Sequence, residues 1–324
     1  MKKLIALCMA FCSAAMLYAT SPDNIKVNKY EENTTWKNSA LDQTLLWEIL
    51  QDPSTPKVLA VKVTAQRSVQ NGQERETFFV PAAKEISREV VAYLQKSMLE
   101  WRTKANYFLP TPYKLPFVNV MEPAEAAQPF PDATPIEYDV SIEPDSHPRV
   151  VGKAGYWEDG TRSAMKLPIL RHLELYFAIE NRLAQATDEN QIQRLTSRAQ
   201  NALEMYEHQA SHILANQFNK DPQDTYTHFC EHNPLESWRE NSGSAFARIL
   251  RTVITHEFGH HLGLSHGAPN TIMAFSVNEP RAQAHVTNED GRRLAVLVCY
   301  IHNRMQVQSQ SDVQPCQPFE RAHK

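Results

Sequence analysis

The first half of the chain shows several short stretches in which apolar and polar residues alternate with the period of a β-strand. Residues 58–64 and 77–80 are rich in β-branched and aromatic residues and lie on either side of Asn71-Gly72. Asn-Gly between two such stretches is a strong hairpin signal. Further strands are predicted at residues 117–121, 136–143, 150–157 and 164–170.

Helical spacing of three and four residues alternates with these strands and dominates the second half. One helix is predicted to carry Ile86, Val90, Leu94 and Trp101 on one face and to be entered through Pro81. Residues 170–218 predict a helical hairpin, broken near Asp188, in which Thr187 caps the second helix. Two more helices are expected, one capped by Ser242 or Ser244 and carrying apolar residues up to Ile254, and one running from Thr287 to about His302. This order predicts an α+β fold.

The helix expected after Ser244 leads into the most informative residues of the chain. Residues 256–266 read His-Glu-Phe-Gly-His-His-Leu-Gly-Leu-Ser-His. His256 and His260 are four residues apart, which places their Cβ atoms roughly 5–6 Å apart on one helix face. Gly263 can adopt the left-handed conformation that ends a helix, so the chain can reverse and bring His266 to the same ion. Three histidines leave one tetrahedral position of Zn²⁺ open, and Glu257 lies beside it as a candidate general base.

The other histidine pairs of the chain have a simpler interpretation than metal binding. His208 and His212 are also four apart but have no third histidine or carboxylate with them, so we expect a solvated helix face. His261 follows the second ligand and is expected at the surface. His228 and His232 flank Cys230, but that spacing is generic, and a metal there is the less favoured alternative.

The pattern His-Glu-x-x-His-x-x-Gly-x-x-His resembles the metzincin clan of zinc metalloendopeptidases. Met273, seven residues after His266, resembles the methionine of the clan's Met-turn, which forms a floor under the metal. The resemblance implies a metzincin-like catalytic domain with a twisted, mostly parallel sheet, a long helix and a zinc-binding helix, here with the helical hairpin inserted. Phe275 stands where some members have a zinc-reaching tyrosine, and Gly267 matches no familiar subfamily, so the subfamily stays open.

Both ends of the chain suggest processing or extension. Lys2 and Lys3 followed by about fifteen apolar residues resemble a secretory signal ending near Ala19, and this run is shorter than the roughly 20 residues of a membrane span. The predicted division is a signal peptide (1–19), an N-terminal extension or pro-segment (20–74), the zinc metalloprotease domain (75–304, with the insertion at 170–218) and a polar tail (305–324).

Composition narrows the compartment and the partners. Once Cys8 and Cys12 leave with the signal, Cys230, Cys299 and Cys316 remain, and a disulfide between the last two is the natural pairing. No cysteine lies between residues 20 and 229, which excludes an inhibitory pro-segment cysteine there. The formal charge of −4 and the lack of a basic stretch give no reason to expect nucleic acid or an anionic membrane as a partner.

The sequence therefore predicts a secreted or periplasmic zinc endopeptidase that acts on protein or peptide substrates and has no stable membrane anchor after signal cleavage. His256, His260 and His266 would bind Zn²⁺, and Glu257 would act as the base. Two alternatives remain open: a zinc hydrolase of a non-peptide amide, and a non-catalytic binding module on the same scaffold. The presence of Glu257 argues against the second, because a dead site has no use for that carboxylate.

Overall fold

The structure is a computed structural model of the 324-residue chain. It describes residues 44–319 except 53–54, 72–73, 124–132, 134, 146–149, 155–161, 233, 275–284 and 310–313. The signal peptide expected at 1–19 lies outside these residues. The helices are α4 (Leu45–Leu50), α5 (Lys84–Phe108), α7 (Arg171–Leu183), α8 (Glu189–Phe218), α9 (Pro222–Glu231), α10 (Pro234–Ser237), α11 (Ala245–His261) and α12 (Asn288–Ser309). The strands are β1 (Lys57–Asn71), β2 (Glu74–Pro81), β3 (Val118–Met121), β4 (Pro135–Ile142) and β5 (Met165–Lys166).

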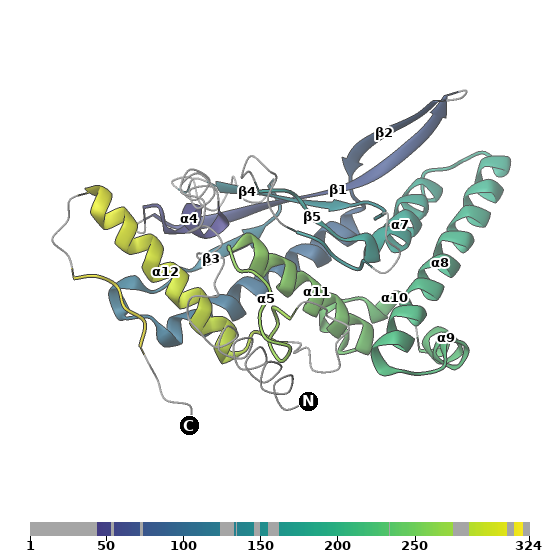
Figure 1. Ribbon diagram of the computed structural model, residues 1–324. Coiled ribbons are helices and arrows are strands. Elements are labelled where there is room, and N and C mark those ends of the chain that lie inside the picture. The colour runs from purple at the N-terminus through teal and green to yellow at the C-terminus, as the bar shows by residue number, and fades with distance from the viewer. Residues whose placement is uncertain are drawn as a thin grey trace, which may run out of the picture.

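One mixed sheet forms the upper layer in Figure 1, with the order β2-β1-β4-β5 and with β3 also paired to β1. All pairings are parallel except the β1–β2 hairpin, in which Asn71 pairs with Glu74. This confirms the hairpin that Asn71-Gly72 predicts, although the turn itself lies outside the described residues. The outer part of the hairpin extends beyond the body as an arm (Figure 1).

Three helices, α5, α11 and α12, lie under the sheet in Figure 1 and share one apolar core with it. The predicted face of α5 is buried, with Ile86, Leu94 and Trp101 at 0% exposure. A twisted, mostly parallel sheet packed against a long helix and the histidine-bearing helix is the α+β architecture that the sequence predicts.

The N-terminal limit of the core differs from the expected boundary at residue 75. β1 is paired on both sides within the sheet, and α4 contributes Leu45, Leu46 and Ile49, each 0% exposed, to the same core. These residues fall in the range 20–74 that was expected to be an extension. The folded core therefore begins by Thr44, because the longest strand of the sheet cannot be separated from its partners.

The predicted helical hairpin is present as α7 and α8, which enclose a small apolar cluster of their own. The cap of α8 is Asp188, whose side chain accepts a hydrogen bond from the Gln191 amide at 2.8 Å, so the expected cap at Thr187 is wrong by one residue. The buried carboxylate of Glu174 on α7 pairs with Arg67 of β1 at 2.7 Å and thereby ties the hairpin to the base of the arm.

The open edge of the sheet is shorter than predicted. The strand expected at 164–170 contracts to β5, and a buried turn of 3₁₀ helix over Pro168–Leu170 follows it. Lys153 forms an antiparallel bridge with Lys166 of β5. Residues 150–154 contain no regular strand, and the rest of the strand expected at 150–157 lies among residues that are not described.

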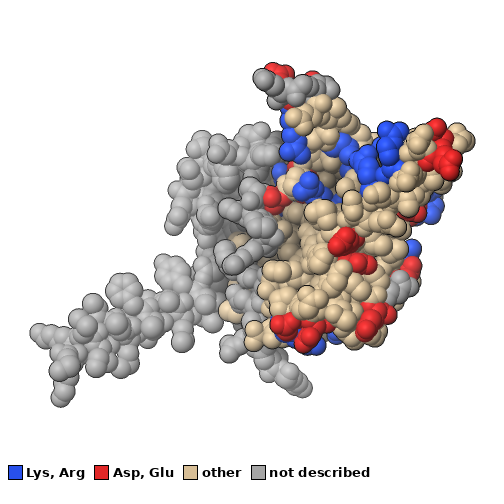
Figure 2. Space-filling view, turned by 90° about the vertical axis from the view of Figure 1, so that its right-hand side faces the viewer, with Lys and Arg blue, Asp and Glu red and all other residues tan. Residues whose placement is uncertain are grey.

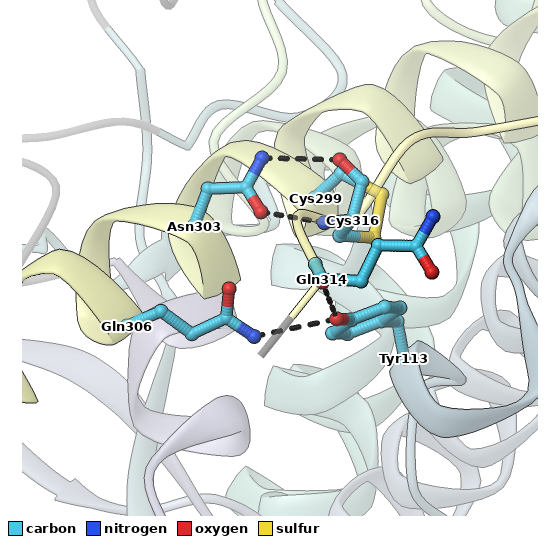
Figure 3. The surroundings of a disulfide bond; sticks show 6 residues. All are labelled: Tyr113, Cys299, Asn303, Gln306, Gln314 and Cys316. Atoms are coloured by element: carbon cyan, nitrogen blue, oxygen red, sulfur yellow. Dashed lines mark hydrogen bonds between the residues drawn. A yellow bond between two sulfur atoms is a disulfide. The ribbon is translucent and has the colours of Figure 1, made fainter. Parts of the chain in front are cut away.

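The C-terminal segment folds back on α12, where the expected disulfide ties it down, and the helix extends past the predicted boundary at residue 305 (Figure 3). α12 continues to Ser309, and the predicted disulfide joins Cys299 to Cys316. Asn303 exchanges two hydrogen bonds with the backbone of Cys316, at 2.7 and 3.0 Å. Tyr113 donates to the carbonyl of Gln314, and Figure 3 shows its ring beside the return segment.

Charged groups of both signs cover the face in Figure 2, where Lys and Arg gather in the upper part and Asp and Glu lie mostly lower. Among the described helices, none has the length and apolar character required to cross a bilayer.

Candidate metal centre

Helix α11 carries His256, Glu257 and His260 in its last turns and is fixed at both ends. Ser244 caps its start by accepting a hydrogen bond from the Ala247 amide at 2.9 Å, which decides between the two serines considered. Near the other end, Thr255 is bonded to α5, since Trp101 donates to its carbonyl at 3.1 Å and Ser97 bonds its hydroxyl at 2.7 Å. The ligand-bearing turns are therefore held from two sides within the core.

Gly263 ends α11 in the way the sequence predicts. Its φ of +101° lies in the left-handed region, and the Leu264 amide donates back to the Gly259 carbonyl at 3.0 Å. The Gly263 amide donates to the His260 carbonyl at 2.9 Å, which completes a Schellman ending. The chain reverses at this point and places His266 beside the two helical histidines.

The three imidazoles converge. The ring centroids lie 4.8 Å apart for His256 and His260, 4.8 Å for His260 and His266, and 5.4 Å for His256 and His266. Their candidate ligand atoms all lie within 4.8 Å of one another, and the two Nε2 atoms of the helical pair are 3.1 Å apart. Tetrahedral zinc with bonds of about 2.0–2.1 Å would hold neighbouring nitrogens about 3.3 Å apart. The residues present fit such an ion.

Hydrogen bonds orient the two helical rings so that Nε2 is available. His256 Nδ1 lies 2.7 Å from the carbonyl of Ile272, and His260 Nδ1 lies 2.8 Å from the carbonyl of Leu264. A carbonyl only accepts, so Nδ1 carries the proton and Nε2 presents its lone pair, as in most metal-binding histidines. Burial, with a smaller contribution from His266, lowers the pKa of His256 to about 4, so this ring is neutral at neutral pH.

Met273 lies under α11 in the position expected for the Met-turn. It is fully buried, and a Cβ added to Gly259 would come within 2.4 Å of its sulfur. The turn is closed by the Thr271 amide, which donates to the carbonyl of Ala268 at 3.0 Å. The close approach of the sulfur requires glycine at residue 259, between the two helical ligands. Phe275, two residues further on, lies outside the described residues.

Helix α12 supplies two supporting residues that the sequence reasoning missed. The buried carboxylate of Asp290 accepts hydrogen bonds from the amides of Ile272 and Thr287 at 3.0 and 2.9 Å. Asp290 thus fixes the residue whose carbonyl orients His256. The residues Thr287-x-x-Asp290 form the cap of α12, since the Asp290 amide donates to the Thr287 hydroxyl at 3.2 Å, and this cap was the available signal in the sequence.

Arg293, one turn later, holds the loop of the third ligand. Its guanidinium donates to the carbonyls of Ser265 and His266 at 3.0 and 3.3 Å. A Cβ on Gly267 would lie only 2.4 Å from Arg293 Nη1. A Cβ at residue 267 would therefore require the end of the Arg293 side chain to shift.

Glu257 is 8% exposed and faces the sheet edge. A Cβ on Gly152 would meet the Glu257 side chain at 3.1–3.2 Å and Val253 at 2.4 Å, so the backbone at residue 152 passes directly over this turn of α11. Burial raises the pKa of Tyr138 on the neighbouring strand β4, and the nearby charge of Glu257 raises it further. The candidate base thus lies between the histidines and the edge of the sheet.

The surface position expected for His261 is wrong. The ring is 0% exposed, and its Nδ1 lies 2.7 Å from the hydroxyl of Tyr138 on β4. His261 lies on the side of α11 that packs against the sheet. Because that side of the helix is covered as well, the residue belongs to the core. His208 and His212 are exposed on α8, as expected, and Cys230 is a free thiol.

The comparisons with known proteins agree with this geometry. The matrixin family model matches residues 174–298, which include the three histidines, the Met-turn and α12 up to residue 298. The match supports a metzincin-clan metallopeptidase and leaves the subfamily unassigned. Neither the curated proteins nor the solved structures include a match to the chain.

The range matched by the family model contains the metal centre but not the sheet. The sheet lies before residue 174, outside the matched range, yet it packs on the same core as α11. The metzincin motif residues that the sequence singles out, His256, His260, His266 and Gly263, meet at one place in the structure. Metzincins of the matrixin family are metallopeptidases that act on protein or peptide substrates.

Proposed function

We propose that this chain is an exported, zinc-dependent endopeptidase in which Glu257 is the general base. The observation that carries the proposal is the convergence of three imidazoles, two of them oriented by hydrogen bonds from Nδ1 to backbone carbonyls, beside a buried carboxylate. Neutral imidazole nitrogens suit Zn²⁺, and three of them leave one position for solvent or substrate.

His256, His260 and His266 would hold the ion. When bound, zinc would supply a lowered pKa for water and polarisation of the scissile carbonyl. Asp290 and Arg293 keep the ligands in place by fixing Ile272 and the His266 loop, so the rings need little reorganisation. Met273 supports the turn of α11 from below and closes the site on that side.

Glu257 would move the proton. Its carboxylate takes a proton from the attacking water and then transfers it to the nitrogen of the leaving amine, which departs as the peptide bond breaks. The backbone at residue 152 lies against Glu257, so a substrate aligned along this edge of the sheet would place its scissile bond beside the base. Phe275 has no hydroxyl to offer the developing oxyanion.

Export is supported by two independent features. Residues 1–19 have the charge and hydrophobicity of a signal peptide, and the chain contains the Cys299–Cys316 disulfide. Disulfides persist mainly in oxidising compartments. The catalytic unit would include α4 and β1 in addition to the range expected from residue 75 onward, with the helical hairpin 170–218 as an insertion within it.

The decisive experiment combines a peptide-library digest with mass spectrometry and metal analysis of the full chain. Wild-type protein should contain zinc, cleave internal peptide bonds, lose activity with a chelator and regain it with zinc. Glu257→Gln should keep its zinc and its fold while kcat/KM falls by about 10²–10⁴-fold, the range for loss of a general base. Undiminished turnover by this variant would refute the role of Glu257.

The same digest separates the proposal from the two alternatives. A zinc-containing protein that cleaves none of the library but hydrolyses amide-bearing cell-wall or small-molecule substrates would indicate the non-peptide hydrolase. A zinc-containing protein with no hydrolysis of either kind would indicate a binding module.

A further inference from the structure

We propose that α9 carries a second metal-binding site, formed by His228, Glu231 and His232, that takes a divalent transition ion such as Zn²⁺. The candidate ligand atoms of these three residues lie within 4.8 Å of one another, as do those of the site on α11. The site is separate from the proposed active site in sequence and in the fold.

The arrangement follows from helical spacing. His228 and Glu231 lie three residues apart in the last turn of α9 and His232 is the C-cap that follows, so all three are grouped at the end of this helix. The two imidazole centroids are 4.1 Å apart, closer than the 4.8 Å of His256 and His260. All three side chains are exposed and can adjust their rotamers to bring their ligand atoms around one ion.

The tautomer of His232 supports the assignment. Its Nδ1 lies 2.8 Å from the carbonyl of His228, so Nδ1 carries the proton and Nε2 is left with a lone pair. His256 and His260 are prepared by the same kind of bond to a backbone carbonyl. This orientation is the one that metal-binding histidines commonly have.

The exposed pair on α8 shows what is missing when spacing is the only resemblance. The ring of His208 stacks on Tyr226 with centroids 4.3 Å apart, and His212 Nδ1 pairs with the side chain of Asn216 at 3.0 Å. Among the described residues, no third ligand groups with this pair. His208 and His212 therefore provide a matched control with the same spacing.

The electrostatics and the anchoring of α9 suit a cation. The site lies at the C-terminal end of the helix, where the helix dipole favours positive charge. On its inner side α9 is fixed by Phe229, which packs on Tyr206 and on Phe246 of α11 with centroids 6.0 and 6.1 Å apart.

The chemistry of the ligands selects the ion. Imidazole nitrogen with one carboxylate favours Zn²⁺, Ni²⁺ or Cu²⁺, whereas Mg²⁺ and Ca²⁺ prefer sites made of oxygen ligands. Bound metal would join His228 in the last turn of α9 to His232 just beyond it and so fasten the end of the helix.

Calorimetric titration of the metal-free full chain with ZnCl₂ tests the proposal. Wild-type protein should bind two zinc ions in two steps, the weaker one at α9, and MgCl₂ should give no second step. His228→Ala with His232→Ala should abolish only the weaker step, and the retained tight step shows that the variant is folded. His208→Ala with His212→Ala should keep both steps.

Glu231→Gln should weaken the second step by at least about ten-fold, the minimum typical of losing even an outer partner of a metal ligand. A single step in wild-type protein, or a second step that survives loss of His228 and His232, would overturn the proposal. Because the readout is binding at α9, a chain without peptidase activity that still shows this step would sink the proposed function and leave the second site intact.

Discussion

Two histidine pairs with the same spacing lie on two long helices of this protein, and only one of them forms a centre. His256 and His260 on α11 are 4% and 7% exposed, whereas the side chain of His208 on α8 is 60% exposed. Both helices also end in a left-handed residue, Gly263 after α11 and Asn219 after α8. Only the reversal after α11 returns a third histidine to the pair.

The difference shows that the i, i+4 spacing supplies two nitrogens and little else. On α11, carbonyls from the following loop accept hydrogen bonds from Nδ1 of both rings, and a residue of α12 holds that loop. On α8 the rings interact with neighbouring surface side chains instead. A metal centre therefore depends on the chain beyond the helix as well as on the spacing within it.

The largest effect is expected from removing one histidine of each pair. His260→Ala should lose the tightly bound zinc ion of this site and reduce hydrolysis to the level of chelator-treated wild type, because only two of its three histidine ligands remain. His212→Ala should keep both zinc content and kcat/KM. Metal analysis after gel filtration and a peptide assay measure the two effects. Equal losses in both variants would erase the distinction between the pairs.

The next effect concerns the support from α12. Asp290→Asn should weaken zinc binding by about 10–100-fold, the usual cost of losing a partner that orients a metal ligand. The neighbouring Glu289→Gln is the matched control, because the hydrogen bonds described for the Glu289 carboxylate come from Arg292, whereas the Ile272 amide donates to Asp290. Competition with a chromophoric chelator gives both affinities. Unchanged affinity in Asp290→Asn would show that Ile272 needs no such anchor.

A smaller effect is expected at the reversal itself. Gly263→Ala should destabilise the fold by about 1–2 kcal/mol, the cost of a left-handed L-residue. Its new Cβ would also lie 3.0 Å from the Leu297 side chain, which adds to that cost. Gly243→Ala is the control, since φ is +68° there and no atom lies within 4 Å of the added Cβ. Chemical denaturation should show the larger loss for Gly263→Ala, and equal losses would mean that Leu297 yields freely.

The smallest effect is a pH dependence that comes from a half-buried histidine, His302. Burial lowers the pKa of His302 on α12, so below about pH 6.5 the unfolded chain binds a proton that the folded chain does not. The free energy of unfolding of the metal-free protein should therefore decrease as the pH falls from 7 to 5.

His302→Phe should flatten this slope by less than about 1.4 kcal/mol per pH unit. Denaturation curves at several pH values measure the slopes. A slope in His302→Phe that equals that of wild type would assign the pH dependence to other groups.

The sequence predicts the centre well because its main parts are local. Eleven consecutive residues, from His256 to His266, contain the ligands, the carboxylate and the glycine of the reversal. Helical periodicity likewise places α5, α8 and α11, and Asn71-Gly72 marks the hairpin. These features depend on neighbours within a few positions along the chain.

What the sequence did not predict depends on contacts between distant segments. The place of β1 within the sheet requires β3 and β4, which lie about 60–80 residues further along the chain. Asp290 and Arg293 act on residues 18–28 positions away. The angle between His261 and the ligands around the helix axis predicts a surface position for His261. Tyr138 of β4 covers that side of the helix instead. Periodicity does not identify which element covers a face.

The disulfide between Cys299 and Cys316 should affect how far the protein can be degraded from its C-terminal end by other proteases. An exopeptidase that trims the chain from its C-terminus meets a crosslinked residue at position 316, still short of α12. The amide of Phe319 is already engaged, donating to the carbonyl of Phe108 at 2.8 Å. Removal of residues from this end would therefore stop before α12, the helix whose residues hold the loops of the metal ligands, and the protein would resist degradation by exopeptidases.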